Sequence, residues 1–416
     1  MSRHPGLYQF TQEVTSHFPH LSKPMAAVLA LWAFGMVLAR SCGQTRVAAA
    51  LAPLLGQKDN TVRERLRDWY RSAPEKTRAK HGGKRAELDV HTCWAPWLRW
   101  VLNDWSGRQL AVALDATTLG QRFTVLVLSV LYRGCAVPVA WKVLPAREPH
   151  PWAPEWRALL QQFRSVLPAD WTVIALADRG LYAKWLFEAI LALGWHPLLR
   201  INTRGTFRPE GWKRRVPLSE LVPTVGRRWQ GRGEAFQAAP QRLRCTLLAC
   251  WEPGYTDPWL VLTDLPPCAA SACWYGLRAW IEQGFKRVKR GGWQWQGTRM
   301  TDPLRAERLW LALALATWWC LSVGGEAEAE LQVETLPELP GEPRSSAPGS
   351  ARRERGRWRL VGVFLRGYSL ILAALLLWQP LPWGQGRPEP WPEMPTPQEQ
   401  HEPTSPESIK DKTLPV

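Results

Sequence analysis

The stretch QLAVALDATTLGQRFTVLVLSVLYRGCAVPVAWKVL, residues 109–144, decides the fold class. It holds three runs rich in Val and Leu, which is typical of strands buried in a sheet, and Arg133-Gly134 predicts a tight hairpin between the last two. Further elements follow in this order: a helix at 155–167, a buried strand at 171–178, a helix at 182–194 and a strand at 196–202. A meander followed by a β-α-β unit predicts a mixed sheet with flanking helices in an α/β domain.

The rest of the chain is divided by composition and periodicity, and 416 residues exceed what one hydrophobic core usually organises. The predicted segments are a helical N-terminal region (1–105), the first part of the α/β core (106–203), a β-rich insertion (204–270), the second part of the core (271–324), a linker rich in Glu, Pro, Gly and Ser (325–357), a C-terminal helix (358–380) and a disordered Pro/Glu-rich tail (381–416).

Charge and cysteine content restrict the class of protein. The formal net charge of +17 favours a polyanionic partner, either nucleic acid or an anionic membrane surface. The eight cysteines lack zinc-site spacing and a paired framework, and no secretion signal is seen, which favours the reducing cytoplasm. Three apolar runs, 26–39, 309–323 and 369–378, are shorter than the roughly 18 to 20 residues of a spanning helix, so we expect buried helices and no membrane partner.

The N-terminal region contains a candidate DNA-binding motif. A short apolar helix, a break at Gly56 and a second helix opening at Thr61 resemble a helix-turn-helix, and Thr61 with Glu64 has capping-box spacing. Arginines make the second helix basic, and we expect Arg63 and Arg67 to contact DNA. The alternative interpretation is a solvated basic helix.

The segment YGLRAWIEQGFKRVKRGGW, residues 275–293, places one acid within a basic helical pattern. With 3.6 residues per turn, Tyr275, Arg278, Glu282 and Lys289 fall within an arc of about 60° and are expected on one face. The apolar stripe expected to pack on the core consists of Trp274, Leu277, Ile281, Phe285 and Val288. Taken alone, Arg278 and Glu282 can equally be a surface pair four residues apart.

Two further acids change that balance. Asp115 and Asp178 are each expected at the end of a buried strand, where ligands of open α/β sheets gather, although either can be a turn residue or helix cap. Clustered carboxylates ionise together only when cations neutralise them, and hard oxygen ligands select Mg²⁺ or Mn²⁺. We therefore expect Asp115, Asp178 and Glu282 to hold two such ions for metal-dependent phosphoryl transfer.

The spacing Tyr275, two residues, Arg278, three residues, Glu282, six residues, Lys289 resembles the signature of a group of bacterial insertion-sequence transposases of the DDE type with an RNase H-like core. ALDATTLG around Asp115 and ALADRGLY around Asp178 are similar to the family's first two acidic motifs, and the resemblance covers residues 45–323.

This resemblance implies the roles of the site residues. Asp115, Asp178 and Glu282 would be catalytic, metal-binding acids, and Tyr275, Arg278 and Lys289 would contact the transposon end.

The resemblance also implies cut-and-paste transposition at terminal inverted repeats, with a DNA hairpin in related enzymes and a homodimer that holds two DNA ends. A tryptophan of the insertion stacks on a flipped base in such relatives, and Trp229, Trp251 and Trp259 all compete for that role here. Two alternatives stay open: a structure-selective DNA nuclease without strand transfer, and a catalytically silent DNA-binding regulator of transposition.

Overall fold

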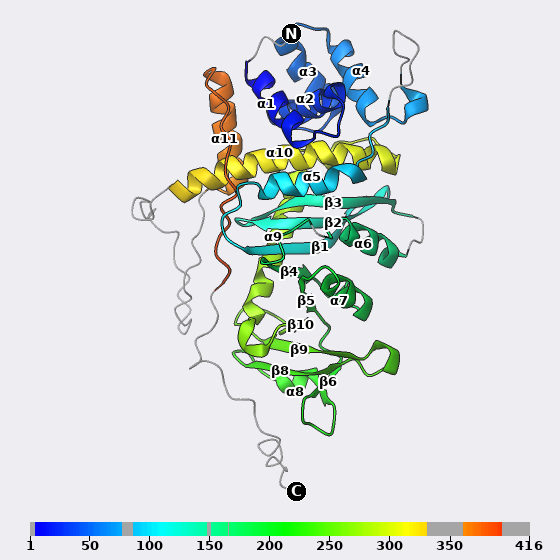
Figure 1. Cartoon of the computed structure of the whole chain (residues 1–416), viewed down its shortest axis with the longest axis vertical. Helices are drawn as coiled ribbons and strands as arrows, with labels where there is room; N and C mark the ends of the chain where they lie inside the picture. Colours follow the sequence, from blue (N-terminus) through cyan, green and yellow to red (C-terminus); the bar gives the residue numbers. More distant parts are fainter. Residues whose placement is uncertain (1–4, 77–85, 148–150, 165, 331–360, 393–416) are drawn as a thin grey trace.

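The computed structural model describes residues 5–76, 86–147, 151–164, 166–330 and 361–392. Helices α1 to α4 gather at one end of the molecule, and α5 and α10 lie between them and the sheet (Figure 1). The N-terminal helices are α1 (Pro5–His17), α2 (Lys23–Ala39), α3 (Gln44–Leu55), α4 (Asp59–Tyr70) and α5 (His91–Leu102).

One sheet of ten strands, in the order β3-β2-β1-β4-β5-β10-β9-β8-β6-β7, forms the rest of the core. The strands are β1 (Gln109–Leu119), β2 (Phe123–Tyr132), β3 (Cys135–Pro145), β4 (Thr172–Ala177), β5 (His196–Arg200), β6 (Thr206–Pro209), β7 (Val216–Pro217), β8 (Arg228–Ala235), β9 (Leu243–Cys250) and β10 (Trp259–Thr263). β1 to β3 are an antiparallel meander, whereas β4 is parallel to both β1 and β5. This arrangement confirms the predicted α/β class and mixed sheet.

The β2–β3 hairpin shows how local chemistry sets the sheet edge. Arg133 and Gly134 have φ of 44° and 76°, the left-handed turn that matches strand twist, and Tyr132 pairs with Cys135 across it. Further along, the register shifts between Leu128 and Ser129, opposite Pro138. Proline cannot donate a ladder hydrogen bond, so its place on the edge strand next to a bulge is the expected one.

The insertion continues the core sheet through its own strands. β10 pairs antiparallel with β5, with Val261 opposite Arg200 and Leu262 opposite Leu199. β9, β8, β6 and β7 then follow outward from β10. The predicted boundary between the insertion and the core, at residue 270, does not follow the strand pairing. β10 precedes residue 270 in the chain, yet it pairs with the core strand β5.

Helices cover both faces of the sheet. The remaining helices are α6 (Trp152–Gln161), α7 (Lys184–Leu191), α8 (Leu218–Leu221), α9 (Trp280–Val288), α10 (Pro303–Glu330) and α11 (Val363–Leu376), with 3₁₀ turns η1 (Ala73–Glu75), η2 (Ala239–Gln241), η3 (Pro267–Ala269), η4 (Ala272–Ala279) and η5 (Trp295–Gly297). Alternate residues of β1 divide between two cores: Val112 and Leu114 join the one that holds α5, α6, α7 and α10, whereas Ala111 and Ala113 join the one beneath η4.

Helix α10 is longer than the apolar run 309–323 that was judged too short to span a membrane. It runs for 28 residues and is long and apolar enough to span a bilayer, although 94% of its most apolar window is buried by the protein. Within the described ranges α2 and α3 would also pass this test if taken as one span bent by 97°. The helical segments that contain the runs 26–39 and 309–323 are thus longer than the runs predicted from sequence. The burial of α10 is nevertheless that of a core helix.

Helix α4 differs from its predicted start. It begins at Asp59, two residues before Thr61, so the predicted capping box at Thr61 and Glu64 is wrong. Glu64 instead pairs with Arg67 one turn later. The break at Gly56 is confirmed, because its left-handed φ of 60° ends α3.

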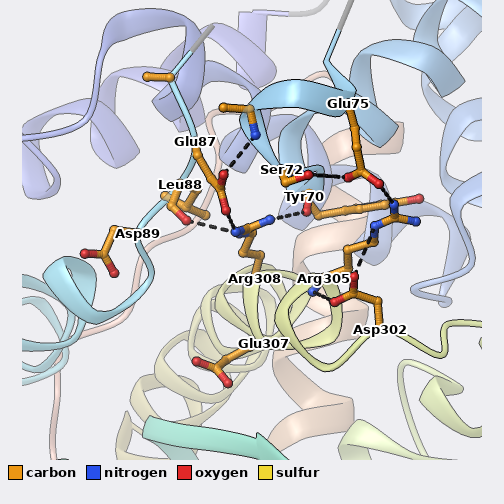
Figure 2. Close-up of polar contacts among 12 residues, drawn as sticks. Tyr70, Ser72, Glu75, Glu87, Leu88, Asp89, Asp302, Arg305, Glu307 and Arg308 are labelled. Carbon is orange, nitrogen blue, oxygen red and sulfur yellow. Dashed lines mark hydrogen bonds and ion pairs between the residues drawn. The ribbon is translucent and has the colours of Figure 1, made fainter.

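A polar junction ties α10 to the segment that precedes α5 (Figure 2). Buried Arg308 donates to the carbonyls of Leu88 (3.1 Å) and Tyr70 (2.8 Å) and pairs with Glu87. Arg305 pairs with Glu75, whose other oxygen accepts a bond from the Ser72 hydroxyl. These contacts fix the N-terminal helices against the core.

The C-terminal predictions need two corrections. α10 continues to Glu330, so residues 325–330 are helix, and the rest of the predicted linker, 331–357, lies outside the described residues. α11 falls within the predicted 358–380 helix. Residues 381–392 were predicted to be disordered, yet Leu381 is buried and Trp383 stacks on Trp319. Residues 393–416 lie outside the described part.

Candidate active site

Two acids meet where the parallel ladder between β1 and β4 ends. Leu114 and Ala177 are its last register pair, and Asp115 and Asp178 are the next residues of each chain segment. Asp115 does not end its strand as predicted, because β1 continues beside β2 to Leu119. It is the loss of the β4 partner, and not a turn, that leaves room for both carboxylates at this edge.

Helical segments η4 and α9 bring the third acid over the sheet. The predicted single helix is divided here: a 3₁₀ stretch ends at Ala279 and the α-helix begins at Trp280. The predicted apolar stripe still faces the core, with Phe285 half-buried and the other members buried. At Gly284 an added Cβ would lie 2.9 Å from the carbonyl oxygen of Ala136 in β3, so this helix crosses the strand at close range.

Arg278 lies between the three predicted acids. One of its terminal nitrogens is 2.6 Å from Asp115 Oδ2 and 3.2 Å from Asp178 Oδ2, and the other is 3.5 Å from Glu282 Oε1. The side chains of Arg278 and Asp115 are 13% and 16% exposed, against 39% for Asp178 and 61% for Glu282. The Arg278–Glu282 pair is therefore one side of a four-residue cluster and not an isolated surface pair.

Burial dominates the electrostatics of Asp115. Desolvation raises the pKa of this carboxyl above its usual range, opposed by the Arg278 charge and the bond from the Ala116 amide (2.8 Å), while Asp178 and Glu282 raise it further. Asp178 accepts the Gly180 amide at 2.8 Å, which holds its side chain at the β4 turn. A carboxyl in this position is costly to ionise without a cation.

Tyr275 lies beneath the cluster and not on an open face. It is buried, with its ring edge-on to Trp259 at 5.7 Å between centroids and the Arg200 guanidinium 5.7 Å from its centroid. Burial raises the pKa of Tyr275. Arg200 was not among the predicted site residues, although its place at the end of β5, next to β4, was a signal that could have identified it.

Lys289 is also set apart from the acids. It ends α9, where its amide donates to the Phe285 carbonyl at 3.0 Å, and burial lowers the pKa of its half-buried side chain. In the described ranges it forms no ion pair, so its charge is available to a phosphate. DNA contact by Tyr275 and Lys289 stays a prediction.

The predicted DNA-contact arginines of α4 differ from each other. Arg67 is held by Glu64, with 3.0 Å from Nε to Oε2, which reduces its free charge. The side chain of Arg63 has no ion pair within the part of the chain described, and its carbonyl accepts a bond from Gln44. DNA contact by either residue stays a prediction, and Arg63 is the better placed of the two.

The three candidate tryptophans have different neighbours. Trp229 packs edge-on against Phe207, and Trp251 donates to the Tyr255 carbonyl at 3.0 Å. Trp259 contacts Tyr275 and is therefore the one that lies next to η4. No stacking role is assigned to any of them.

The three acids supply the oxygen donors of a candidate metal centre, but they do not form one by themselves. Within the described residues, no three His, Cys, Asp or Glu side chains converge closely enough to hold an ion by themselves. The donor set still suits Mg²⁺ or Mn²⁺, since Asp115, Asp178 and Glu282 present oxygens around one positive group, the Arg278 guanidinium. Arg278 has to move aside for the three acids to share a metal.

Comparison with known proteins decides the family. The profile of the transposase DDE domain matches residues 107–319, a range that contains all three acids. This chain belongs to the DDE transposase family. It is accordingly an enzyme that acts on DNA, in a family that generally uses divalent metal ions. The predicted α/β core lies within the matched range, and its RNase H-like assignment stays a prediction.

Other comparisons are weaker. The crystal structure of human ENDOV is similar at 14% identity and a TM-score of 0.23, over 53% of this chain and 94% of that chain. A cryo-EM structure of the piggyBac transposase synaptic complex with hairpin DNA is similar at 10% identity and a TM-score of 0.27, over 87% of this chain and 89% of that chain. Both TM-scores are low. Comparison with curated protein sequences finds no match.

Proposed function

We propose that this DDE transposase performs cut-and-paste transposition of an insertion sequence, acting at terminal inverted repeats. The observation that supports it is the convergence of Asp115, Asp178 and Glu282 on the single cation Arg278. Structural ion pairs seldom bring three acids to one partly buried arginine at a sheet edge, since unneutralised carboxylates repel. The cluster is better explained as a site prepared for cations and phosphates.

The three acids would hold Mg²⁺ or Mn²⁺, two ions in our proposal, and the bound metal would activate water and stabilise the leaving oxygen. Once displaced from the acids, Arg278 can bind a DNA phosphate near the cut, together with Lys289. Water attacks the phosphorus at the element's end and releases a 3′-hydroxyl. That hydroxyl then attacks a target phosphorus, displaces the target strand's own 3′-oxygen, and so joins the two DNAs.

The proposal includes a homodimer that holds two DNA ends in the bacterial cytoplasm near the nucleoid. It rests on the need to cut both ends of an element and on the net charge of +17, which attracts DNA. Arg63 and Arg67 of α4 would add phosphate contacts outside the acid cluster.

The test is cleavage of labelled DNA that carries the element's terminal repeat, with Mg²⁺. We expect wild type to cut and Asp115→Asn, Asp178→Asn and Glu282→Gln each to be inactive, while Asp170→Asn, an exposed acid paired with Arg108, keeps full activity. Cleavage retained by the three site variants would refute the assignment.

A target plasmid in the same reaction distinguishes the alternatives. Joined donor–target products support transposition, whereas cleavage without joining indicates a structure-selective nuclease. Repeat binding without any metal-dependent cleavage would indicate a silent regulator.

A further inference from the structure

Residues 379–392, here called the C-terminal strap, lie outside the family match at 107–319 and have no helix or strand. Figure 1 shows this segment descending from α11 past α10 along the side of the sheet. Its composition is that of a solvated tail, yet it contacts the rest of the molecule near its start, in its middle and at its described end. The contacts occur in three groups.

The first group joins the strap to α1 and α10. Trp383 stacks on Phe10 and Trp319, with centroids 5.4 and 5.7 Å apart, and Trp319 donates its indole N–H to the Pro382 carbonyl at 3.0 Å. At Gly384 an added Cβ would lie 2.0 Å from the Ser322 carbonyl, so only glycine permits this approach. The start of the strap is a packed part of the core.

The second group provides hydrogen-bond partners for the strap's backbone, which needs them because the strap belongs to no helix or sheet. The Gln385 amide donates to Glu326 at 2.8 Å, and the Gly386 carbonyl accepts from the Ser106 amide at 2.9 Å. Arg133 of the β2–β3 hairpin donates to the Arg387 carbonyl at 2.5 Å. The strap is thus fixed along the hairpin before it reaches η4.

The third group reaches the active-site segment. Trp391 packs edge-on against Trp274, with centroids 5.0 Å apart at 60°, and Trp274 donates its indole N–H to the Pro392 carbonyl at 2.9 Å. Trp274 belongs to η4, immediately before Tyr275 and one turn before Arg278. A 3₁₀ helix has poorer hydrogen-bond geometry than an α-helix, so its position depends strongly on packing.

We infer that the strap positions η4, and through it Arg278, for the reaction at the acid cluster, with Trp391 and Pro392 as positioning residues. The expected effect of the strap on catalysis rests on the proposed function. The expected effect on the stability of η4 does not rest on it, because the Trp391–Trp274 contact holds η4 whether or not the protein cuts DNA. The strap also connects α1 of the N-terminal helices with the edge of the sheet that holds the acid cluster.

The experiment compares Trp391→Ala with Trp391→Phe, which keeps an aromatic ring against Trp274, and with Trp378→Ala, an exposed tryptophan at the end of α11. Hydrogen–deuterium exchange of the full chain, without DNA or metal, is measured over 272–279 and over β1. We expect exchange in 272–279 to rise about tenfold in Trp391→Ala alone, since losing an aromatic pair opens the segment locally. β1 should be unchanged.

With repeat DNA and Mg²⁺, we expect kcat of Trp391→Ala to fall about tenfold with KM unchanged, and Trp391→Phe to recover most of it. Unchanged exchange in 272–279, or an equal rise in β1, would overturn the inference. If exchange rises as expected but wild type never cuts, the proposed function fails and the positioning of η4 stands. A fall in activity that Trp378→Ala shares would show that the strap has no specific role.

Discussion

Arg278→Gln is the substitution that tests the acid cluster most directly. Removing one partner of a buried ion pair costs about 3 to 5 kcal/mol, and the Arg278–Asp115 pair, at 13% and 16% exposure, approaches that case. The more exposed Asp178 and Glu282 add at most about 1 kcal/mol each. Because Asp115 keeps some water access, we expect a loss near the lower bound, about 3 kcal/mol.

The assay is a thermal melt without metal, at one scan rate. At about 2 °C per kcal/mol, the lower end for domains of about 150 to 250 residues such as the matched 107–319, the Tm should fall by about 6 °C. The same substitution in an Asp115→Asn background should cost about 1 kcal/mol, because the buried charge that Arg278 neutralises is then gone. Mn²⁺ should raise the Tm of Arg278→Gln more than that of wild type, where the metal must first displace the guanidinium.

An equal cost of Arg278→Gln with and without Asp115→Asn would show that Arg278 does not neutralise a buried Asp115 charge. Equal stabilisation of wild type and Arg278→Gln by Mn²⁺ would show that Arg278 does not compete with the metal. Asp170→Asn serves as the control that should shift neither measurement, because its ion pair with Arg108 is exposed.

Three further outcomes are expected. Burial raises the folded-state pKa of Asp115, so ionising this carboxyl lowers the stability of the folded protein. This loss of stability is absent below the unfolded-state pKa and complete once pH exceeds the folded-state pKa. Melts from pH 4 to 8 should therefore show the Tm of Asp115→Asn rising relative to that of wild type as pH increases. Arg308→Met removes the charged partner of Glu87, which keeps its bond from the Ala73 amide, and the donor to the Leu88 and Tyr70 carbonyls, so it should cost about 3 kcal/mol. A melt like that of wild type would show that the junction is dispensable. Gly284→Val should cost about 1 to 3 kcal/mol by pushing α9 off Ala136, and a crystal structure with α9 in place would contradict this.

The strands were predictable because their chemistry is local. Runs of Val and Leu, and Arg133-Gly134 between two of them, specify strands and a turn without reference to the rest of the chain. The three acids were predictable as a set, but the position of Arg278 between them was not. A helical wheel places Arg278 near Glu282, yet only the pairing of β1 with β4 brings Asp115 and Asp178 to the same guanidinium.

Other features depend on contacts between residues that are far apart in the sequence. Thr61 and Glu64 match a cap, but the chain turns into α4 already at Asp59. The wheel over 275–289 assumes one regular α-helix, whereas η4 is wound more tightly, and Tyr275 accordingly packs inward against Trp259. In both cases the pattern predicted a helical segment and misplaced individual side chains, and at 272–279 it also predicted an α-helix where the chain forms a 3₁₀ helix.

The Pro/Glu-rich end of the chain shows why average composition is a poor guide where a few side chains determine whether a segment packs. Averaged over 381–416, the segment is too polar to fold, which is why it was predicted to be disordered. Two tryptophans, Trp383 and Trp391, nevertheless bring 381–392 onto α10 and η4. Aromatic side chains bury large areas each, so two of them can fix a dozen otherwise polar residues. The acids lie within the family match at 107–319, but the packing that supports their arginine extends beyond it.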